Sequence, residues 1–320
     1  MERKSDSVDL SFRKAPRGGE VMSPDNEAFI FLSPRLLLLV HGFNVSAGEA
    51  AATYDGFAEM QRIIIGDTDG SYCEGRLAVR VLWPGDADWG FASALFYPWS
   101  IARAEQTAEV LAESLCRAYR SGLLFEIDII AHSLGCRLAL EMIRCLQVKA
   151  GPRPAVRRIV LMAGAVPTYM LNEAPDARLR RAYDEFLRDP NPVLSLYSGW
   201  DGVLSWAFPL GETIAGGKEF LPTALGREEW RDKDAPPNLL QREVENAGHS
   251  DYWGHRREVN WTPPLKAGRL ARSFLGLAPP LPREVEEWRP AERNTAESRP
   301  GIEERQRLER TTGGFDTGGP

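Results

Sequence analysis

The chain alternates between short apolar runs and longer segments in which apolar residues recur with helical spacing. The apolar runs are nearly continuous, as in strands that are buried on both faces, and they cover residues 35–40, 77–82, 125–131, 158–162 and 193–197. Segments of helical character lie between them, at residues 50–64, 101–119, 134–147 and 176–187. This alternation predicts an α/β fold with a mostly parallel central sheet and helices on both faces.

The two ends of the chain depart from this pattern. Residues 1–27 form a polar segment in which residues 8–12 favour an edge strand. Residues 28–278 carry the alternation and form the predicted α/β domain. Residues 279–320 are rich in Pro, Glu, Arg and Gly and poor in aliphatic residues, so we expect a disordered charged tail.

Charge and composition narrow the classes of partner and compartment. The 320 residues carry a formal net charge of −6, which argues against a general nucleic-acid-binding protein, because such proteins present a basic face. The longest aliphatic run, at residues 36–40, is too short to cross a bilayer, and the charged N-terminus lacks the apolar core of a secretory signal. We therefore expect a cytoplasmic protein without a transmembrane segment, in an oligomeric state that the sequence leaves open.

The arrangement of the cysteines is consistent with the cytoplasmic compartment expected above. The chain has four, and none of them forms a CxxC pair. Free thiols are therefore favoured, although a disulfide stays open.

A polar His-Ser pair stands at the end of one apolar run. The order is Ala131-His132-Ser133-Leu134-Gly135, with a predicted strand before it and a helix after it. In a parallel sheet, ligands bind beyond the carboxyl ends of the strands. A tight strand–turn–helix with small residues on either side of a serine exposes its hydroxyl as a nucleophile, although the usual G-x-S-x-G pattern has glycine where this chain has Ala131. The alternative is that Ser133 only caps the helix.

An activated serine requires a base, and the base requires an acid that orients it. Of the four histidines, His41 precedes the serine and His132 is expected to be aimed elsewhere by the turn. His249 lies in a loop after the last strand and is preferred to His255, which is typical of a surface position. Asp201 follows the fifth predicted strand and completes the order serine, acid, histidine, although a turn aspartate before a glycine is the alternative.

The negatively charged oxygen of a tetrahedral intermediate needs hydrogen-bond donors. We expect one from the backbone N–H of Leu134, directly after the serine, and a second from the backbone N–H of Phe43, in the HGFN turn after an early strand. Taken alone, that turn is an ordinary strand–loop connection. The chemistry requires no metal and no organic cofactor, since the chain has no phosphate-binding glycine motif and its histidines match no metalloprotease spacing.

Two stretches follow the second and fifth predicted strands: residues 87–100 are rich in aromatic residues, and residues 199–217 are apolar and rich in glycine. Their composition fits the walls of a pocket for an apolar acyl or aromatic group. The side chains predicted to line that pocket are Tyr97, Trp99 and Trp206. Ordinary packing under long loops is the alternative for each of them.

Five motifs, taken together, resemble those of the α/β-hydrolases. They are VHGFNVS (40–46), VLWPGD (81–86), AHSLGCR (131–137), SGWDGVL (198–204) and AGHSDYW (247–253). Their order is similar to that of a bacterial subgroup of uncharacterised serine hydrolases that are esterase- or lipase-like, over residues 35–275. The resemblance implies esterase-type chemistry on a small-molecule ester or acyl substrate, without indicating which acyl group.

The sequence therefore predicts a serine hydrolase that cleaves a carboxylic ester, thioester or amide through an acyl-enzyme on Ser133. Two alternatives stay open. An acyltransferase would use the same residues but pass the acyl group to an acceptor other than water. A non-catalytic scaffold with the hydrolase fold would bind a partner through its tail, although a complete set of catalytic residues counts against it.

Overall fold

The computed structural model describes residues 7–17, 19–24, 27–43, 45–66, 72–86, 97–124, 126–149, 151, 153–173, 177, 179–180, 193–215, 221–254 and 261–277. The chain separates into two units, Met1–Glu286 and Glu287–Pro320, and the described residues all belong to the first. Several sequence predictions fall outside the described residues. They are the charged tail at 279–320, His255, most of the helix expected at 176–187, and residues 87–96 of the aromatic stretch.

A seven-stranded sheet forms the centre of the structure, in the order β1-β3-β2-β4-β5-β6-β7, and each neighbouring pair is parallel. The inner strands are buried along most of their length, which explains their continuous aliphatic sequences. The edge strand β7 has the mixed sequence LLQRE and is half-exposed, so no apolar run reveals it. The strands are β1 (Ser7–Ser11), β2 (Arg35–Val40), β3 (Leu77–Leu82), β4 (Glu126–His132), β5 (Ala155–Met162), β6 (Val193–Tyr197) and β7 (Leu239–Glu243).

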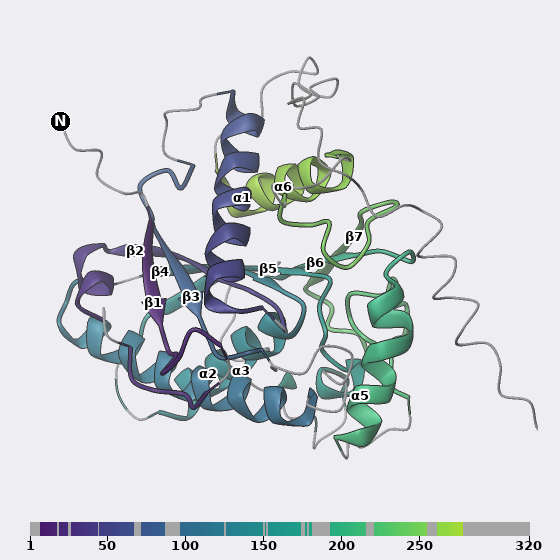
Figure 1. Cartoon of the computed structure of the whole chain (residues 1–320), viewed down its shortest axis with the longest axis horizontal. Coiled ribbons are helices and arrows are strands. Elements are labelled where there is room, and N and C mark those ends of the chain that lie inside the picture. The colour runs from purple at the N-terminus through teal and green to yellow at the C-terminus, as the bar shows by residue number, and fades with distance from the viewer. Residues whose placement is uncertain are drawn as a thin grey trace, which may run out of the picture. The chain divides into compact units, whose positions relative to one another are not determined.

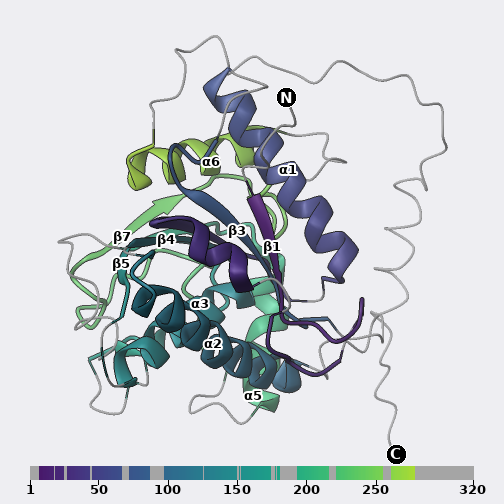
Figure 2. The same ribbon diagram turned by 90° about the vertical axis from the view of Figure 1, so that its left-hand side faces the viewer.

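Helices cover both faces of the sheet (Figure 1). Figure 2 shows α1 (Ala47–Ile65) and α6 (Thr262–Leu275) on one face, and α2 (Tyr97–Arg120), α3 (Leu134–Val148) and α5 (Phe208–Ile214) on the other. Short helical turns complete the described part: η1 (Glu27–Leu32), η3 (Thr168–Met170) and the π-helical turn η4 (Val203–Ala207), which runs directly into α5. The predicted fold, a mostly parallel sheet between two layers of helices, is confirmed.

The helix after β2 begins earlier than its hydrophobic pattern predicts. Ser46 and Glu49 form a capping box, in which the Ser46 side chain accepts the backbone N–H of Glu49 and the Glu49 carboxylate accepts the backbone N–H of Ser46. Four polar or small residues therefore precede the first apolar residue of the predicted helix. The capping box also fixes the point at which the turn after β2 ends.

The order of the strands reverses beside β2. The chain passes from β2 through α1 to β3 on one side, whereas β4 pairs with the other side of β2. At such a reversal a crevice opens beyond the carboxyl ends of the strands, because the connections leave in opposite directions. The turn after β2 and the turn from β4 into α3 both lie at this point.

Two expectations from composition concern membranes and disulfides. Within the described ranges, no helix is long and apolar enough to cross a membrane. Cys73, Cys116, Cys136 and Cys145 are all buried and free. The disulfide left open by the sequence is therefore not formed.

Candidate active site

Ser133 occupies the turn between β4 and α3 in a strained backbone conformation. Its φ of 53° and ψ of −126° lie in a region that residues with a side chain rarely adopt. Although Ser133 stands at the N-cap position of α3, its side chain makes no capping hydrogen bond. Its Oγ lies instead 2.8 Å from Nε2 of His249. Helix capping therefore does not account for this serine.

Two glycines make room for the turn. A Cβ at Gly135 would lie 2.4 Å from the backbone oxygen of His41, so only glycine lets the start of α3 approach the end of β2 this closely. A Cβ at Gly42 would lie 2.8 Å from the Cβ of Ser133. Ala131, where the usual pattern has a glycine, is fully buried inside β4. The turn after β2 and the turn carrying Ser133 are thus in direct contact.

The structure brings Asp201 and His249 to Ser133, from the carboxyl ends of three different strands. His249 Nδ1 lies 2.7 Å from Oδ2 of Asp201, and Nε2 of the same ring faces the serine hydroxyl. Asp201 is completely buried, and its other carboxylate oxygen accepts the backbone N–H of Leu204 at 3.0 Å. In this arrangement an imidazole can take a proton from the serine while the carboxylate stabilises the imidazolium.

The loop that carries His249 is fixed on several sides. The Asp251 carboxylate accepts the backbone N–H of Gly248 at 2.7 Å, and the following residue, Tyr252, is completely buried. His132 donates from its Nε2 to the backbone carbonyl of His249 at 2.7 Å. The turn therefore aims His132 away from Ser133, as expected, and toward the backbone of His249. No sequence pattern indicates the hydrogen bond between His132 and the backbone of His249.

A family model described as "Alpha/beta hydrolase of unknown function (DUF900)" matches residues 32–178. The matched span includes β2, the turn after it, and Ser133, whereas Asp201 and His249 follow it. Together with the parallel sheet and the serine turn, this match decides the superfamily. The chain is an α/β-hydrolase. The resemblance inferred from the five motifs is confirmed at this level.

Similar solved structures include enzymes with esterase and thioesterase names. Est1E from Butyrivibrio proteoclasticus is 12% identical, with 76% of this chain and 88% of that chain covered and a TM-score of 0.39. The RedJ thioesterase from the prodiginine biosynthetic pathway in Streptomyces coelicolor is 16% identical, with 69% and 80% covered and a TM-score of 0.36. A putative hydrolase from Agrobacterium vitis S4 is 16% identical, with 75% and 88% covered and a TM-score of 0.38. No curated protein matches this chain. At these identities and TM-scores the likeness carries no argument about a substrate.

The predicted oxyanion donors lie on the two turns that meet at Ser133. Leu134 is the first residue of α3, so its N–H belongs to the positive end of the helix. Phe43 follows Gly42, the residue that packs against the serine. The end of β2 is held by Trp83, whose indole N–H donates to the backbone carbonyl of His41 at 2.8 Å. The assignment of Phe43 and Leu134 as donors stays a prediction.

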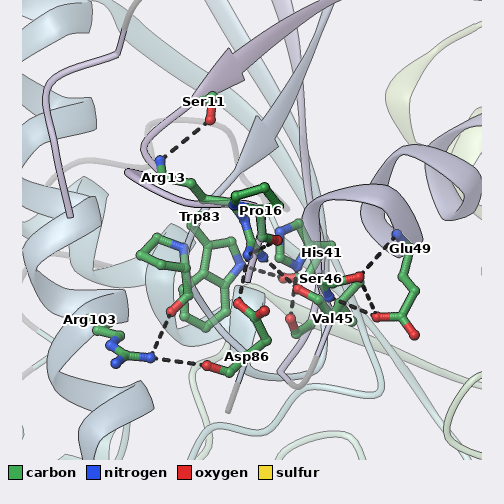
Figure 3. Close-up of polar contacts among 12 residues, drawn as sticks. Ser11, Arg13, Pro16, His41, Val45, Ser46, Glu49, Trp83, Asp86 and Arg103 are labelled. Atoms are coloured by element: carbon green, nitrogen blue, oxygen red, sulfur yellow. Dashed lines mark hydrogen bonds and ion pairs between the residues drawn. The ribbon is translucent and has the colours of Figure 1, made fainter. Parts of the chain in front are cut away.

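The N-terminal segment of this α/β-hydrolase supports the turn after β2 (Figure 3). Arg13 lies just beyond β1 and is buried. Its Nη1 donates to the Asp86 carboxylate at 2.6 Å, and its Nη2 donates to the backbone carbonyl of Val45. Because Asp86 follows β3 and Val45 follows β2, one guanidinium joins the ends of three strands. The sequence resemblance begins at residue 35 and did not include Arg13.

We expect Arg13→Met to destabilise the hydrolase by about 3 to 5 kcal/mol, because it leaves the buried Asp86 carboxylate without its guanidinium partner. Urea unfolding of Arg13→Met, Asp86→Leu and the double variant measures this coupling. The double variant should recover much of the lost stability, since both charges are then gone. Strictly additive losses would show that the two side chains do not support each other.

Two histidines beside the site, the buried His41 and the half-buried His132, have lowered pKa values. Burial lowers the pKa of His41 to about 3, with a further contribution from the Arg13 charge. Burial also lowers the pKa of His132 to about 3, and His249 adds to the effect. The unfolded chain binds these protons near pH 6.5, so it holds more protons than the folded hydrolase between pH 6.5 and 3. The stabilisation is complete above pH 6.5 and decreases as the pH falls through this window.

The variant His132→Gln removes one of these two titrating groups, so a comparison with the wild type gives the contribution of His132 to the pH dependence of stability. We expect the free energy of unfolding of the wild type, relative to the variant, to be about 2 kcal/mol smaller at pH 5 than at pH 7. Urea unfolding of both proteins at the two pH values gives this difference directly. A difference that is independent of pH would mean that His132 is protonated equally in the folded and unfolded states.

The structure describes the side chains of two of the three aromatic residues that are predicted to line a pocket. Trp99 and Trp206 are 62% and 77% exposed. Tyr97 begins α2, and its side chain lies outside the described part. A pocket-lining role for the three stays a prediction.

Proposed function

We propose that this α/β-hydrolase is a serine hydrolase that cleaves carboxylic esters, thioesters or amides through an acyl-enzyme on Ser133. The observation that carries the proposal is the hydrogen-bonded chain Asp201–His249–Ser133, with N···O distances of 2.7 and 2.8 Å. The strained turn that presents Ser133 supports the proposal. Strained backbone conformations of this kind occur mostly at functional sites, where the surrounding structure holds them in place.

The proposed reaction begins when His249 Nε2 accepts the proton of the Ser133 hydroxyl and Oγ attacks the carbonyl carbon. The Asp201 carboxylate stabilises the resulting imidazolium. The N–H groups of Leu134 and Phe43 bind the oxyanion of the tetrahedral intermediate. His249 then gives its proton to the leaving group, and the acyl group remains on Ser133. A water molecule, deprotonated by His249, releases the acid and restores the serine.

Cys136, three residues after the serine, is not a competing nucleophile. It is fully buried, and burial raises the pKa of its thiol far above the ordinary value. Its Sγ donates to the backbone carbonyl of Ala131 at 3.3 Å. The nucleophilic form of cysteine is the thiolate, so this side chain serves packing.

Intact-mass spectrometry after treatment with a fluorophosphonate tests the proposal. We expect a single adduct on the wild type and none on Ser133→Ala, because only an activated serine reacts with this probe. Ser250→Ala is the matched control, since Ser250 is exposed and adjacent to His249, and it should be labelled like the wild type. No adduct on folded wild type would overturn the proposal and favour the scaffold alternative. An acyltransferase would be labelled too, and is distinguished by an acylated product when an alcohol or amine acceptor is added.

A further inference from the structure

In the helical segment that follows Asp201, every exposed position is apolar, while Ser205 and Thr213 are half-buried. Over residues 202–214, which include η4 and α5, the exposed positions are Gly202, Val203, Trp206, Ala207, Leu210 and Ile214. Helices at the surface of a globular protein normally show the opposite arrangement, with charged residues outward. Trp200, just before this segment, is 72% exposed. We refer to Trp200, Val203, Trp206, Leu210 and Ile214 as the apolar stripe, since the last four recur at helical spacing.

The only charged residue of this segment is turned inward. Glu212 is buried, and Arg137 of α3 donates to its carboxylate at 2.9 Å. Arg137 also pairs with Glu105 of α2 at 3.2 Å. Turning the helix so that the apolar stripe faces the protein would break this buried ion pair, at a large cost in free energy. The outward direction of the stripe is therefore set by the packing of α5 against α2 and α3.

The apolar stripe begins at the candidate active site. The Asp201 carboxylate accepts the backbone N–H of Leu204 at 3.0 Å, and its backbone carbonyl accepts the Ser205 hydroxyl at 2.8 Å. The first turn of the segment is thus joined to the residue that orients His249. The exposed Trp99 lies in the first turn of α2, which precedes β4 and so starts at the carboxyl edge of the sheet. Trp99 and the apolar stripe therefore both belong to the carboxyl edge of the sheet, where Ser133 lies.

We propose that the apolar stripe docks this hydrolase onto the surface of an uncharged lipid aggregate, from which the active site takes an acyl ester. The proposal rests on the proposed serine hydrolase function. Tryptophan with aliphatic residues is the composition that inserts at a membrane interface, and exposed apolar patches mark interaction surfaces. The stripe lies on a segment, residues 200–214, that contains no lysine or arginine and whose two acidic residues, Asp201 and Glu212, are buried. An aggregate of neutral or zwitterionic lipid therefore matches it better than an anionic membrane does.

Two other occupants fit the stripe less well. A stable protein–protein interface uses roughly 20 to 30 residues a side, whereas the stripe consists of five side chains. The chain's own tail at 279–320 is charged and poor in aliphatic residues, so it does not complement an uncharged apolar surface. A lipid surface needs no complementary partner of matching shape.

Flotation with large unilamellar vesicles of phosphatidylcholine tests the docking. The variant Leu210→Gln/Ile214→Gln changes two exposed stripe positions. The control Leu123→Gln/Val148→Gln changes two exposed apolar residues at the amino edge of the sheet, one in the connection between α2 and β4 and one at the end of α3. We expect the wild type and the control to float, and the vesicle-bound fraction of the stripe variant to fall at least about tenfold. Binding should be the same at about 0.1 and about 1 M NaCl, because no charge contributes to it.

Activity measurements separate this proposal from the function on which it rests. The stripe variant should keep the wild-type kcat/KM on dissolved p-nitrophenyl acetate and lose about tenfold or more on an emulsified long-chain ester. If the wild type does not hydrolyse the dissolved ester, the proposed function fails, whatever the flotation shows. The docking proposal is overturned if the wild type does not float, if the stripe variant floats as well as the wild type, or if light scattering shows that the stripe holds two copies of the chain together.

Discussion

Replacing Ser133 with alanine is expected to lower kcat for ester hydrolysis by a factor of roughly 10⁵ to 10⁶, as the loss of a nucleophile does in other enzymes with this arrangement. No other described group replaces the hydroxyl at this position, because the buried thiol of Cys136 is held at the carbonyl of Ala131. Steady-state kinetics on a short-chain p-nitrophenyl ester measures the loss. Residual activity within tenfold of the wild type would place the nucleophile elsewhere.

The same substitution should leave the fold intact. The Ser133 side chain makes no capping hydrogen bond to α3, and alanine and serine share the Cβ that is strained at φ 53°. We expect the free energy of unfolding in urea to change by less than about 1 kcal/mol. A larger loss would show that the hydroxyl stabilises the turn, and the kinetic loss would then have to be corrected for unfolded protein.

The second large effect concerns the acid. Asp201→Asn is expected to lower kcat by about 10⁴-fold, as the equivalent change does in other serine hydrolases. The asparagine oxygen can still accept the N–H of Leu204, so the turn is retained. Its NH₂ group would then face His249 Nδ1, which must become the acceptor. The ring proton moves to Nε2, and this nitrogen can no longer take the proton of Ser133.

Asp251→Asn is the matched control for that measurement. Asp251 lies in the same loop as His249, and its carboxylate accepts the backbone N–H of Gly248, which an amide oxygen also does. We expect kcat to change by less than tenfold in this variant. Equal losses in Asp201→Asn and Asp251→Asn would indicate that both act by holding the loop, and that another group orients His249.

The fold could be predicted where burial leaves a clear pattern. The bounds of β2, β3 and β6 agree with the apolar runs, because a parallel strand covered on both faces has no room for polar alternation. The edge strand β7 could not be predicted in this way, since one side of its LLQRE sequence faces water. Edge strands of a parallel sheet lose the continuous apolar run, and short mixed sequences are not distinctive.

The candidate site, too, could be predicted from the sequence only in part. Ser133, Asp201 and His249 each follow a strand, and the fold requires such residues to meet at one edge of the sheet. The contact of His132 with the backbone of His249 spans 117 residues and has no local signature. The sequence predicts Trp206 to line a pocket and does not predict the helical turns over residues 203–214, whose outward face no sequence pattern indicates. The buried Glu212–Arg137 pair decides which face is outward, and it exists only in the packed structure.

The buried ion pair between Arg13 and Asp86 bears on any attempt to shorten the chain. A protein that began at residue 28, where the apolar alternation starts, would lack both β1 and Arg13. The outer edge of β3 would then present unpaired backbone groups to solvent, which invites strand-to-strand aggregation. The carbonyl of Val45 would also lose its hydrogen bond to the guanidinium. Residues 7–17 are therefore part of the minimal folded unit, and a truncation intended to aid crystallisation or expression should leave β1 and Arg13 in place.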